Sequence, residues 1–414
     1  MRVLIVGGGG REHALAWKLA SESEIFACPG NPGIAELGTC LPAGSHQDIL
    51  EHCQSLSIDL VVVGPEDPLV AGLADILRSA GILTFGPNRC GAVLEASKSY
   101  SKSLMIKADI PTAGGGSFNN PGYALDFAES LFLGGSGVVV KASGNALGKG
   151  VLMCPTFEEA KEAISRMMEH REFGEAGDTV VIEEWLPGRE FSLLTLVSGR
   201  HYHSLPIAQD YKRALDGDEG PNTGGMGTYS PVPWVTADLI ARTEQEIVEP
   251  TLRLLRAEGI DYRGTLFTGV MVVDDQPFCL EYNVRFGDPE TQSVMRRLGS
   301  GFLDALLACA RGERIPPCEV LNNAAVTVVL ASDGYPGAYQ KGVPLHLPEL
   351  DERVVVFHAG TAMLDGQLVS AGGRVLGISA SAQSLESART LVYQAIQSMN
   401  TTGLRCRKDI GTGQ

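Results

Sequence analysis

The chain has 414 residues, of which 44% are hydrophobic and 20% charged, a composition typical of a soluble globular protein with two or three domains. Its formal net charge of −16 argues against a general nucleic-acid or membrane-surface binder, because both need a basic surface. A small phosphorylated ligand is compatible with this charge, since a few local lysines and backbone N–H groups can outweigh the overall field.

Cysteine usage and the N-terminus indicate the compartment. The nine cysteines form no C-x-x-C pair, which argues for a reducing environment and against a structural zinc site. The first residues indicate a short strand rather than a signal peptide, and no apolar run approaches the roughly 18 residues of a membrane span. We therefore expect a cytoplasmic protein that binds neither nucleic acid nor a membrane.

The first hundred residues alternate between strand and helix patterns. Residues 1–20 indicate a strand, a glycine turn and a helix, and residues 59–85 a strand, a helix and a strand. Such alternation predicts a parallel, doubly wound sheet. A helix rich in lysine and serine is expected at about 93–108.

From residue 110 onward the pattern changes to α+β with hairpins. Antiparallel strands at 134–153 belong to an inserted lobe, which we place at about 118–188. A long structureless loop is expected at 208–231. The remaining expected elements are helices at 156–171, 236–258 and 384–399, strands at 266–273 and 277–284, and a last segment that begins near Asn323. The predicted class is therefore mixed α/β and α+β, with domains at 1–100, 101–322 and 323–414.

A glycine turn, GGGGREHA, follows the first strand. A G-x-G-x-x-G dinucleotide fingerprint would need glycine where Glu12 stands, which disfavours NAD binding. The turn still suits a phosphate group at the start of a helix. Two more polar turns, PGN at 29–31 and GPED at 64–67, follow other strands and favour a ligand site at this edge. The alternative is a tight turn with no ligand.

The stretch KASGNALGKG, between two apolar runs, predicts the tip of a hairpin that grips phosphate. It is not a Walker A loop, because Gly144 stands four residues before Gly148 where five are needed. Lys149 is also followed by Gly150 rather than by serine or threonine. The residues after this loop read as a strand, whereas a P-loop leads into a helix.

An acidic strand–turn–strand, VIEEWLPGRE, comes next in the chain. Glu183 and Glu184 end one strand and Glu190 opens the following one, so the turn could meet a base edge and ribose hydroxyls. The alternative is an acidic hairpin that faces water. In the 208–231 loop, Asp210 and Lys212 carry charge and PNTGGMG presents backbone N–H groups, which favours function over a mobile surface loop.

The segment CLEYNVRFGDPETQ carries the most chemistry. Glu281 and Asn283 are two residues apart on an expected strand, so both point to one face. A carboxylate and an amide oxygen are ligands suited to Mg²⁺ that is held mainly by substrate phosphates. Arg285 continues this face and could clamp a carboxylate with two hydrogen bonds. The alternative is an ordinary charged strand edge.

Together, the glycine–lysine hairpin, the acidic turn and the E-x-N strand resemble the ATP-grasp fold. Blocks from residue 7 to residue 411, including GGREHALAWKL, KASGNALGKGV, PNTGGMG, RFGDPETQ and CRKDIG, resemble the phosphoribosylamine–glycine ligase (glycinamide ribonucleotide synthetase) family. The resemblance implies the second step of de novo purine synthesis, in which ATP, glycine and 5-phosphoribosylamine give ADP, phosphate and glycinamide ribonucleotide through a glycyl phosphate. It also implies Mg²⁺ or Mn²⁺ as cofactor, a phosphoribosylamine-binding N-terminal domain, and a monomer or weak homodimer.

The resemblance assigns roles to individual residues. It implies that ATP is bound by Lys102, Lys141, Gly148, Lys149, Gly150, Glu183, Glu184, Trp185, Leu186 and Glu190. It implies that the other substrates are bound by Gly10, Arg11, Glu12, Asn31, Pro65, Glu66, Gly224, Gly225, Met226, Gly227 and Asp288. The implied catalytic residues are Lys212, Arg285 and Asp210, and the implied metal ligands are Glu281 and Asn283.

Three positions depart from the family pattern. Asn145 stands where leucine is usual, Tyr211 where histidine is frequent, and Val284 where cysteine is common. The rival functions are another ATP-grasp carboxylate–amine or carboxylating ligase of purine synthesis, a dinucleotide-dependent oxidoreductase, and a nucleotide-binding protein without turnover. Amino-acid dependence of ADP release, NAD(P)H binding and ATP binding without turnover distinguish them.

Overall fold

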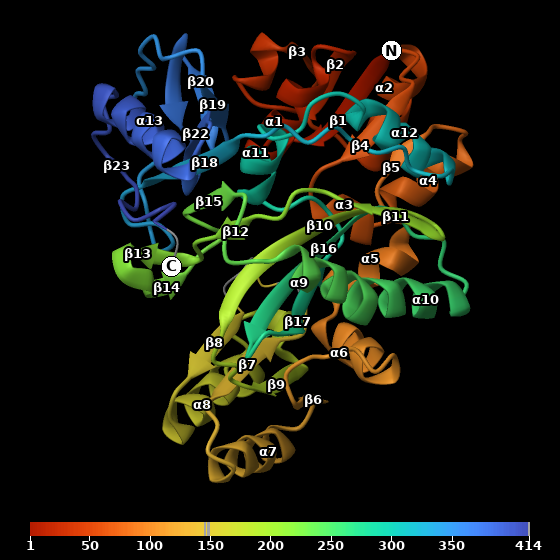
Figure 1. The fold of residues 1–414 in the computed structure, drawn as a ribbon, viewed down its shortest axis with the longest axis vertical. Coiled ribbons are helices and arrows are strands. Elements are labelled where there is room, and N and C mark those ends of the chain that lie inside the picture. The colour runs from red at the N-terminus through yellow and green to blue at the C-terminus, as the bar shows by residue number, and fades with distance from the viewer. Residues whose placement is uncertain (145, 147–149, 413–414) are drawn as a thin grey trace.

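The computed structural model of the chain describes residues 1–144, 146 and 150–412. In Figure 1 a parallel sheet and its helices form the upper part, in red and orange, with a C-terminal sheet in blue beside them. Long antiparallel strands in green cross the centre, and a separate small sheet in yellow forms the lower end. The expected combination of α/β and α+β architecture is confirmed.

The N-terminal sheet has five parallel strands in the order β3-β2-β1-β4-β5. Its strands are β1 (Arg2–Gly7), β2 (Glu24–Pro29), β3 (Gly38–Cys40), β4 (Leu60–Val63) and β5 (Thr84–Phe85). The runs VLIV and LVVV are buried, as expected for parallel strands covered by helices. A Cβ on Gly8 would lie 2.3 Å from the carbonyl oxygen of Gly30, so only glycine lets the β1 and β2 turns approach this closely.

The helices of this part differ in detail from the prediction. They are α1 (Gly10–Leu19), α2 (His46–Ser55), α3 (Glu66–Val70), α4 (Leu73–Ser79), α5 (Arg89–Ala96) and α6 (Lys98–Lys107). The single helix expected between the strands at 59–85 is two, because Gly72 has a φ of +91°, outside the helical range. The single helix expected at 93–108 is also wrong. Ser97 has extended backbone and caps α6 by accepting a hydrogen bond from Tyr100 N.

The central sheet has the order β11-β10-β16-β17, with every neighbouring pair antiparallel. Its strands are β10 (Arg189–Ser198), β11 (His201–Ser204), β16 (Arg263–Val273) and β17 (Gln276–Asn283), and its helices include α9 (Ala237–Thr243), α10 (Glu249–Ala257), α11 (Glu290–Met295) and α12 (Phe302–Arg311). The expected strands at 266–273 and 277–284 are confirmed. A π-helical turn joins α9 to α10 in place of one regular helix at 236–258.

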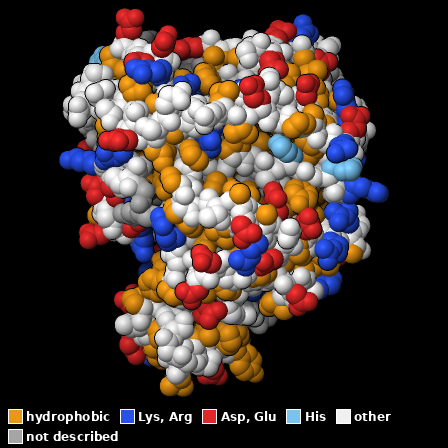
Figure 2. Space-filling view, in the orientation of Figure 1, with side chains coloured by type: hydrophobic (Ala, Val, Ile, Leu, Met, Phe, Trp, Pro, Cys, Tyr) orange, Lys and Arg blue, Asp and Glu red, His pale blue; other side chains and the backbone are white. Residues whose placement is uncertain are grey.

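The lower lobe has a four-stranded sheet in the order β6-β9-β7-β8. It consists of β6 (Gly115–Phe118), β7 (Val138–Ala142), β8 (Val151–Cys154), β9 (Val180–Glu184), α7 (Pro121–Leu133) and α8 (Phe157–Ile164). The lobe has its own apolar core, which includes Val138, Val140, Ile164 and Ile182. It projects from the body at the lower end of Figure 2, where hydrophobic and uncharged side chains cover much of the face shown and acidic side chains are scattered among them.

The C-terminal sheet corrects the expectation of a structureless loop at 208–231. Its strands run β12-β15-β18-β22-β19, with β23 beside β18. They are β12 (Gln209–Asp210), β15 (Gly227–Ser230), β18 (Ala324–Ser332), β19 (Val354–His358), β22 (Arg374–Ala382) and β23 (Leu404–Arg405), and α13 (Leu385–Ser398) packs on β18 and β22. Two hairpins form separate two-stranded sheets, β13 (Arg213–Leu215) with β14 (Glu219–Asn222) and β20 (Thr361–Leu364) with β21 (Gln367–Ser370).

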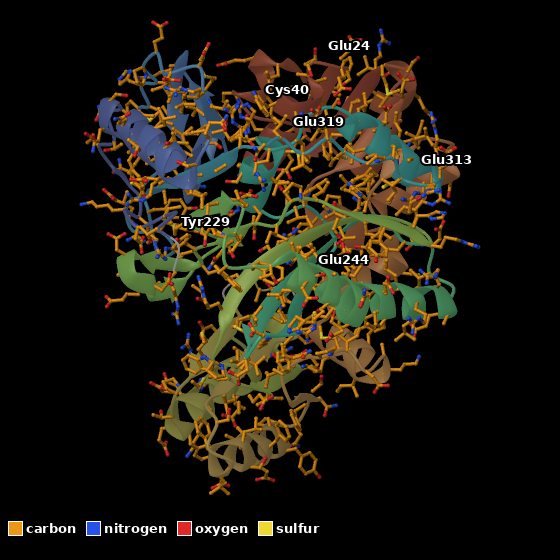
Figure 3. The ribbon with its side chains drawn as sticks, viewed as in Figure 1. Glu24, Cys40, Tyr229, Glu244, Glu313 and Glu319 are labelled. Carbon is orange, nitrogen blue, oxygen red and sulfur yellow. The ribbon has the colours of Figure 1, made fainter. Side chains whose placement is uncertain are left out.

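Thus β12 and β15 come from the middle of the chain but lie at the edge of the C-terminal sheet. Tyr229 on β15, labelled in Figure 3, is fully buried, and its hydroxyl bonds Gln209 Oε1 at 2.5 Å. The sequence pattern failed here because each strand is short and takes its partner from a distant segment. Across the described residues, no helix has both the length and the apolar character that a membrane crossing requires.

Candidate functional site

Two lysines from different elements meet one buried carboxylate. Lys102 of α6 lies 2.5 Å from Glu183 at the end of β9, and Lys141 of β7 forms an ion pair with the other carboxylate oxygen. Burial alone would raise the pKa of the Glu183 carboxyl, but the two lysines outweigh burial and hold that pKa below its usual range. The glutamate therefore stays ionised and fixes both ammonium groups in place.

Each of these lysines has further partners that fix its direction. Lys102 Nζ donates to Thr112 Oγ1 at 2.9 Å and to the Ala113 carbonyl at 2.8 Å. Lys141 Nζ donates to the Leu280 carbonyl at 3.2 Å, at an irregular point of the β16–β17 pairing. The lysines thus connect the lower lobe to the central sheet.

The strand–turn–strand expected for the adenine side is present. β9 ends at Glu184 and β10 begins at Arg189, so Trp185 and Leu186 lie in the turn. Glu184 accepts a hydrogen bond from Gly114 N at 2.7 Å, and Trp185 N donates to the Gly137 carbonyl. Gly150 is buried before β8, whereas the expected phosphate-binding residues Gly148 and Lys149 and the departure at Asn145 lie outside the described residues.

The expected metal ligands lie side by side on β17. Glu281 is surrounded by Lys212, Lys141, Lys98 and Arg285, and these cations overcome burial and hold the pKa of the Glu281 carboxyl below its usual range. Within the described part of the chain, no hydrogen bond or ion pair engages this carboxylate. Asn283 Oδ1 accepts from Arg285 Nη2 at 3.3 Å.

This donor set fits a divalent cation. An ionised carboxylate that forms no hydrogen bond or ion pair with the described residues and an amide oxygen that keeps a lone pair are hard-oxygen ligands. The described residues contain no cluster of three or more His, Cys, Asp or Glu side chains suited to a metal. The remaining ligands would therefore be phosphate oxygens and water, as Mg²⁺ sites at nucleotides require.

Arg285 is held by two acidic residues of the N-terminal part. Its guanidinium lies 2.8 Å from Glu95 and 3.4 Å from Glu66. These carboxylates outweigh the effect of burial and raise the pKa of Arg285, so the arginine is permanently charged. The second Glu95 oxygen accepts from Val284 N at 2.7 Å. Sequence analysis missed Glu95, although it follows Leu94, which is buried, in the stretch LEASKSYSK at residues 94–102, another part of the chain that resembles the family.

Lys212 and Asp210 lie at the centre of an acidic cluster. Lys212 Nζ is 2.5 Å from Glu190 at the start of β10. Burial raises the pKa of Asp210 to about 7, and the neighbouring Glu290, Glu190 and Glu281 add to the rise, while Lys212 opposes it. Glu290, which accepts from Ser192 at 3.1 Å, was also missed by sequence analysis. Its position within the RFGDPETQ block was the available signal.

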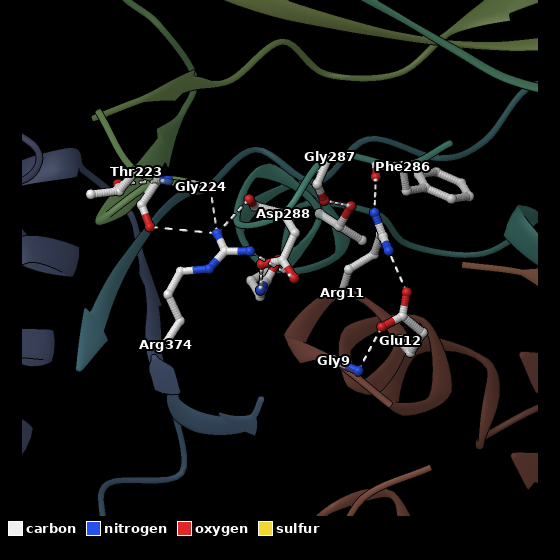
Figure 4. A network of polar contacts seen from close by, with 12 residues as sticks. Gly9, Arg11, Glu12, Thr223, Gly224, Phe286, Gly287, Asp288 and Arg374 are labelled. Atoms are coloured by element: carbon white, nitrogen blue, oxygen red, sulfur yellow. Dashed lines mark hydrogen bonds and ion pairs between the residues drawn. The ribbon is translucent and has the colours of Figure 1, made fainter. Parts of the chain in front are cut away.

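The glycine turn of the N-terminal sheet joins the same region. Arg11 Nε bonds Glu12 Oε1 at 2.6 Å, and Arg11 Nη1 donates to the Phe286 carbonyl at 3.0 Å. The other Glu12 oxygen accepts from Gly9 N at 2.6 Å, as Figure 4 shows. Asn31 Nδ2 donates to the Gly8 carbonyl at 2.9 Å. Gly10 begins α1, and Pro65 and Glu66 begin α3 nearby.

The expected GGMG segment at 224–227 is tied to the same network by an arginine of β22. Arg374 Nη1 donates to the carbonyls of Gly224 and, at 2.7 Å, of Asp288 (Figure 4). Its Nη2 is 3.4 Å from the Asp288 carboxylate, and this charge and Arg11 overcome burial and lower the pKa of Asp288. Arg374 lies in the stretch GGRVLGISA at residues 372–380, which also resembles the family, and sequence analysis assigned it no role. Met226 N donates to the Tyr211 carbonyl, and Gly227 starts β15.

A small lobe whose glutamate pairs with two lysines, next to an antiparallel sheet with a carboxylate–amide pair, is typical of an ATP-grasp enzyme. Biotin carboxylase of Campylobacter jejuni shares this fold, with a TM-score of 0.76 at 14% identity over 99% of this chain and 94% of that one. The N, ATP-grasp (A) and C domains of phosphoribosylglycinamide synthetase match residues 1–95, 96–291 and 325–413. The chain belongs to the phosphoribosylglycinamide synthetase family.

Relatives match over almost the whole chain. The phosphoribosylamine–glycine ligase of Agrobacterium fabrum is 46% identical over 419 residues, which cover 99% of this chain and 98% of that protein. The crystal structure of phosphoribosylamine–glycine ligase from Thermotoga maritima has a TM-score of 0.89 at 37% identity, covering 99% of this chain and all of that one. The trifunctional purine biosynthetic protein adenosine-3 of Gallus gallus is 44% identical, and the match covers 42% of its length.

Proposed function

We propose that this chain is a phosphoribosylamine–glycine ligase, which joins glycine to 5-phosphoribosylamine with conversion of ATP to ADP and phosphate in purine biosynthesis. The observation that carries the proposal is the meeting of three parts at one place. The lysine pair at Glu183, the Glu281–Asn283 pair and the Asp210–Lys212 cluster are connected through Arg285 to Glu66, in the turn after β4 of the N-terminal sheet. Family membership and near-complete matches to ligases of this name support it.

The ATP phosphates lie at Lys102 and Lys141 in this proposal. Phosphoryl transfer needs mainly positioning and charge neutralisation, and two fixed ammonium groups supply both. Glu183 pairs with both lysines and directs their ammonium groups, so its carboxylate serves the phosphate side through them. The turn formed by Glu184, Trp185 and Leu186 takes the adenine, and Glu190 takes the ribose. Gly148, Lys149 and Gly150 close over the phosphates.

Glu281 and Asn283 would hold the divalent cation, Mg²⁺ or Mn²⁺. When bound, such a cation neutralises charge on the transferred phosphoryl group. Glu281 is ionised and without a protein partner within the described residues, so it can accept the cation without breaking an existing ion pair. Lys212 and Arg285 lie near the Glu281 carboxylate, and their positive charges stabilise the negative charge of the transferred phosphoryl group.

Glycine lies at Asp210, Lys212 and Arg285 in this proposal. Asp210 binds its ammonium group, while Lys212 and Arg285 attract its carboxylate. A glycine carboxylate oxygen attacks the γ-phosphorus, ADP leaves, and a glycyl phosphate results. The nitrogen of phosphoribosylamine then attacks the glycyl carbon, the bond to phosphate breaks, and the nitrogen loses a proton. Closure of the loop at 144–150 over the phosphates excludes water, which would otherwise hydrolyse the acyl phosphate.

Phosphoribosylamine lies at the N-terminal turns. Gly10, Arg11, Glu12, Asn31, Pro65 and Glu66 surround the β1, β2 and β4 strand ends, and the segment 224–227 and Asp288 face them across Arg374. The N-terminus of α1 favours a phosphate group. We also propose the division into a phosphoribosylamine-binding domain at 1–100, an ATP-grasp domain at 101–322 with a lid lobe at 118–188, and a C-terminal domain at 323–414.

ADP release tests the proposal. Purified protein is assayed with ATP, Mg²⁺ and glycine, with and without phosphoribosylamine formed in place from ribose 5-phosphate and ammonia. We expect ADP only when both co-substrates are present, and none when alanine replaces glycine. Folded protein that releases no ADP in the complete mixture, or releases it equally without glycine, would refute the proposal.

A matched pair of lysine variants locates the activity. Lys212 and Lys107 each form an ion pair with a single glutamate, at 2.5 Å and 2.7 Å, but Lys107 lies on the surface of α6. We expect Lys212→Gln to abolish ADP release and Lys107→Gln to leave it unchanged. Equal activity of the two variants would remove Lys212 from the proposed mechanism.

A further inference from the structure

The end of the chain lies between α13 and the segment that carries Asp210 and Lys212. We call residues 404–412 the C-terminal strap. Behind the strap, Arg389 of α13 donates to the carbonyls of Lys408 and Ile410, at 2.7 and 3.1 Å. Tyr393 of the same helix donates to the Arg407 carbonyl at 2.9 Å. The strap is therefore anchored to a helix that packs on the C-terminal sheet.

Arg407 faces the other way, toward the 209–222 segment, and only 1% of its surface is exposed. Its Nη1 bonds Asp218 at 2.7 Å and the Arg213 carbonyl at 3.0 Å. Asp409 receives two hydrogen bonds from the same guanidinium, at 2.6 and 2.8 Å. The guanidinium lies over the ring of Tyr211, 4.7 Å from its centre. One side chain thus holds the start and the tip of the β13–β14 hairpin together.

Backbone groups of the strap add to this attachment. Gly217 N donates to Asp409 at 2.9 Å, and Lys408 N donates to Asp216 at 2.7 Å. Gly411 N donates to the Tyr211 hydroxyl at 3.2 Å. These contacts join segments about 190 to 200 residues apart in sequence. These hydrogen bonds hold the β13–β14 hairpin in one position, unlike a hairpin that moves freely at the surface.

Side chains alternate along the attached segment. Tyr211 is buried on the strap side, whereas Lys212 reaches Glu190 and Asp210 lies near Glu290 and Glu281 on the site side. We propose that Arg407 is a positioning residue for the ligase reaction. By fixing Tyr211 and the β13–β14 hairpin on the strap side, Arg407 determines the positions of Asp210 and Lys212 on the site side. This inference rests on the proposed function, and it gives the C-terminal domain a part in the chemistry.

The positioning role predicts a specific kinetic pattern. A displacement of about 1 Å at a reacting centre is enough to cost about 100-fold in rate. We therefore expect Arg407→Ala to lower kcat by about 10- to 100-fold and to raise the KM for glycine, which Asp210 and Lys212 face. The KM for ATP should change less than the KM for glycine, because the strap reaches the ATP side only through the Lys212–Glu190 ion pair and the lysines at Glu183 do not contact the strap.

Arg296 provides the matched control. Its guanidinium lies 4.8 Å from the centre of the Trp17 ring and donates to the Arg353 carbonyl and to Ser381 Oγ, all outside the 209–222 segment. Both variants therefore lose a stacked, hydrogen-bonded arginine at a contact between distant segments. Arg296→Ala should lower the unfolding temperature yet leave kcat and both KM values within about twofold of wild type.

The assay compares the two variants by ADP release with varied glycine and varied ATP, below both unfolding temperatures. Asp218→Asn, which removes one exposed partner of Arg407, is the second variant should Arg407→Ala not fold. It should show the same pattern with smaller effects, and the KM for glycine should rise more than the KM for ATP. Wild-type protein without ADP release refutes the proposed function itself. Active wild type, with Arg407→Ala or Asp218→Asn indistinguishable from Arg296→Ala, refutes only the positioning role.

Discussion

Replacement of Asp210 by asparagine should stabilise the substrate-free protein and inactivate it. The pKa of this carboxyl rises from 3.8 to about 7 on folding, first through burial. Such a rise corresponds to about 4 kcal/mol of unfolding free energy once the carboxyl is ionised in both states. Glu290, whose pKa is also raised, shares the cost, so this figure is an upper limit for Asp210 alone.

The sign of the effect follows from the order of ionisation. Below pH 4 the carboxyl is protonated in the folded and the unfolded chain, and Asp210 costs nothing. Between pH 4 and pH 7 it ionises more readily in the unfolded chain, so its contribution to stability falls as pH rises. The amide that replaces the carboxyl cannot ionise, so the advantage of Asp210→Asn should grow over this range and level off above pH 7.

Thermal unfolding between pH 5 and pH 8.5 measures this difference. With about 2 cal/mol/K per residue of unfolding entropy, 4 kcal/mol corresponds to about 4 or 5 °C for a cooperative transition of this chain. Asp126→Asn, at an exposed carboxyl on α7, is the control and should show no growing difference. An advantage of Asp210→Asn that does not change with pH would refute the argument from burial and charge.

Three further substitutions test other parts of the site. Glu183→Gln should lower the unfolding free energy by about 3 to 5 kcal/mol, because two buried lysines lose their carboxylate. Bound ATP should restore part of this loss, and denaturant unfolding with and without ATP measures the two values. An equal loss in both conditions would contradict the proposed role of Glu183 in directing the lysines toward the phosphates. Glu281→Gln should raise the Mg²⁺ concentration needed for half-maximal activity more than about 10-fold, and an unchanged Mg²⁺ titration would exclude Glu281 as a ligand. Gly8→Ala places a Cβ 2.3 Å from the Gly30 carbonyl oxygen, so the KM for phosphoribosylamine should rise while that for ATP stays constant; equal changes in both would argue for general damage.

Sequence reasoning identified the parts of the site that are local. Glu281 and Asn283 share a face because strand side chains alternate, and the glycine turn of residues 7–14 leads into α1 as expected. The acidic partners of the site were not visible in this way. Glu95 and Glu290 lie near Arg285 and Asp210 only because α5 and α11 place them there in the folded chain. No spacing rule in the sequence predicts these contacts.

The loop at 208–231 shows why the rest needed the structure. Its strands have two to four residues each, too few for a periodic signal, and they are stabilised by partners near residues 327 and 407. The expectation of a functional segment came from its charged residues and glycines. Its order comes from contacts made almost two hundred residues later in the chain.

The placement of β12 and β15 at the edge of the C-terminal sheet constrains how the protein is made. During synthesis the segment at 209–230 emerges about a hundred residues before β18, its partner. Until β18 is released from the ribosome, β15 has an unpaired edge that can bind other chains. The arrangement of Asp210 and Lys212 therefore has to wait for the last part of the polypeptide. A nascent chain that stops near residue 322 would carry both residues and still lack the strand on which their segment pairs.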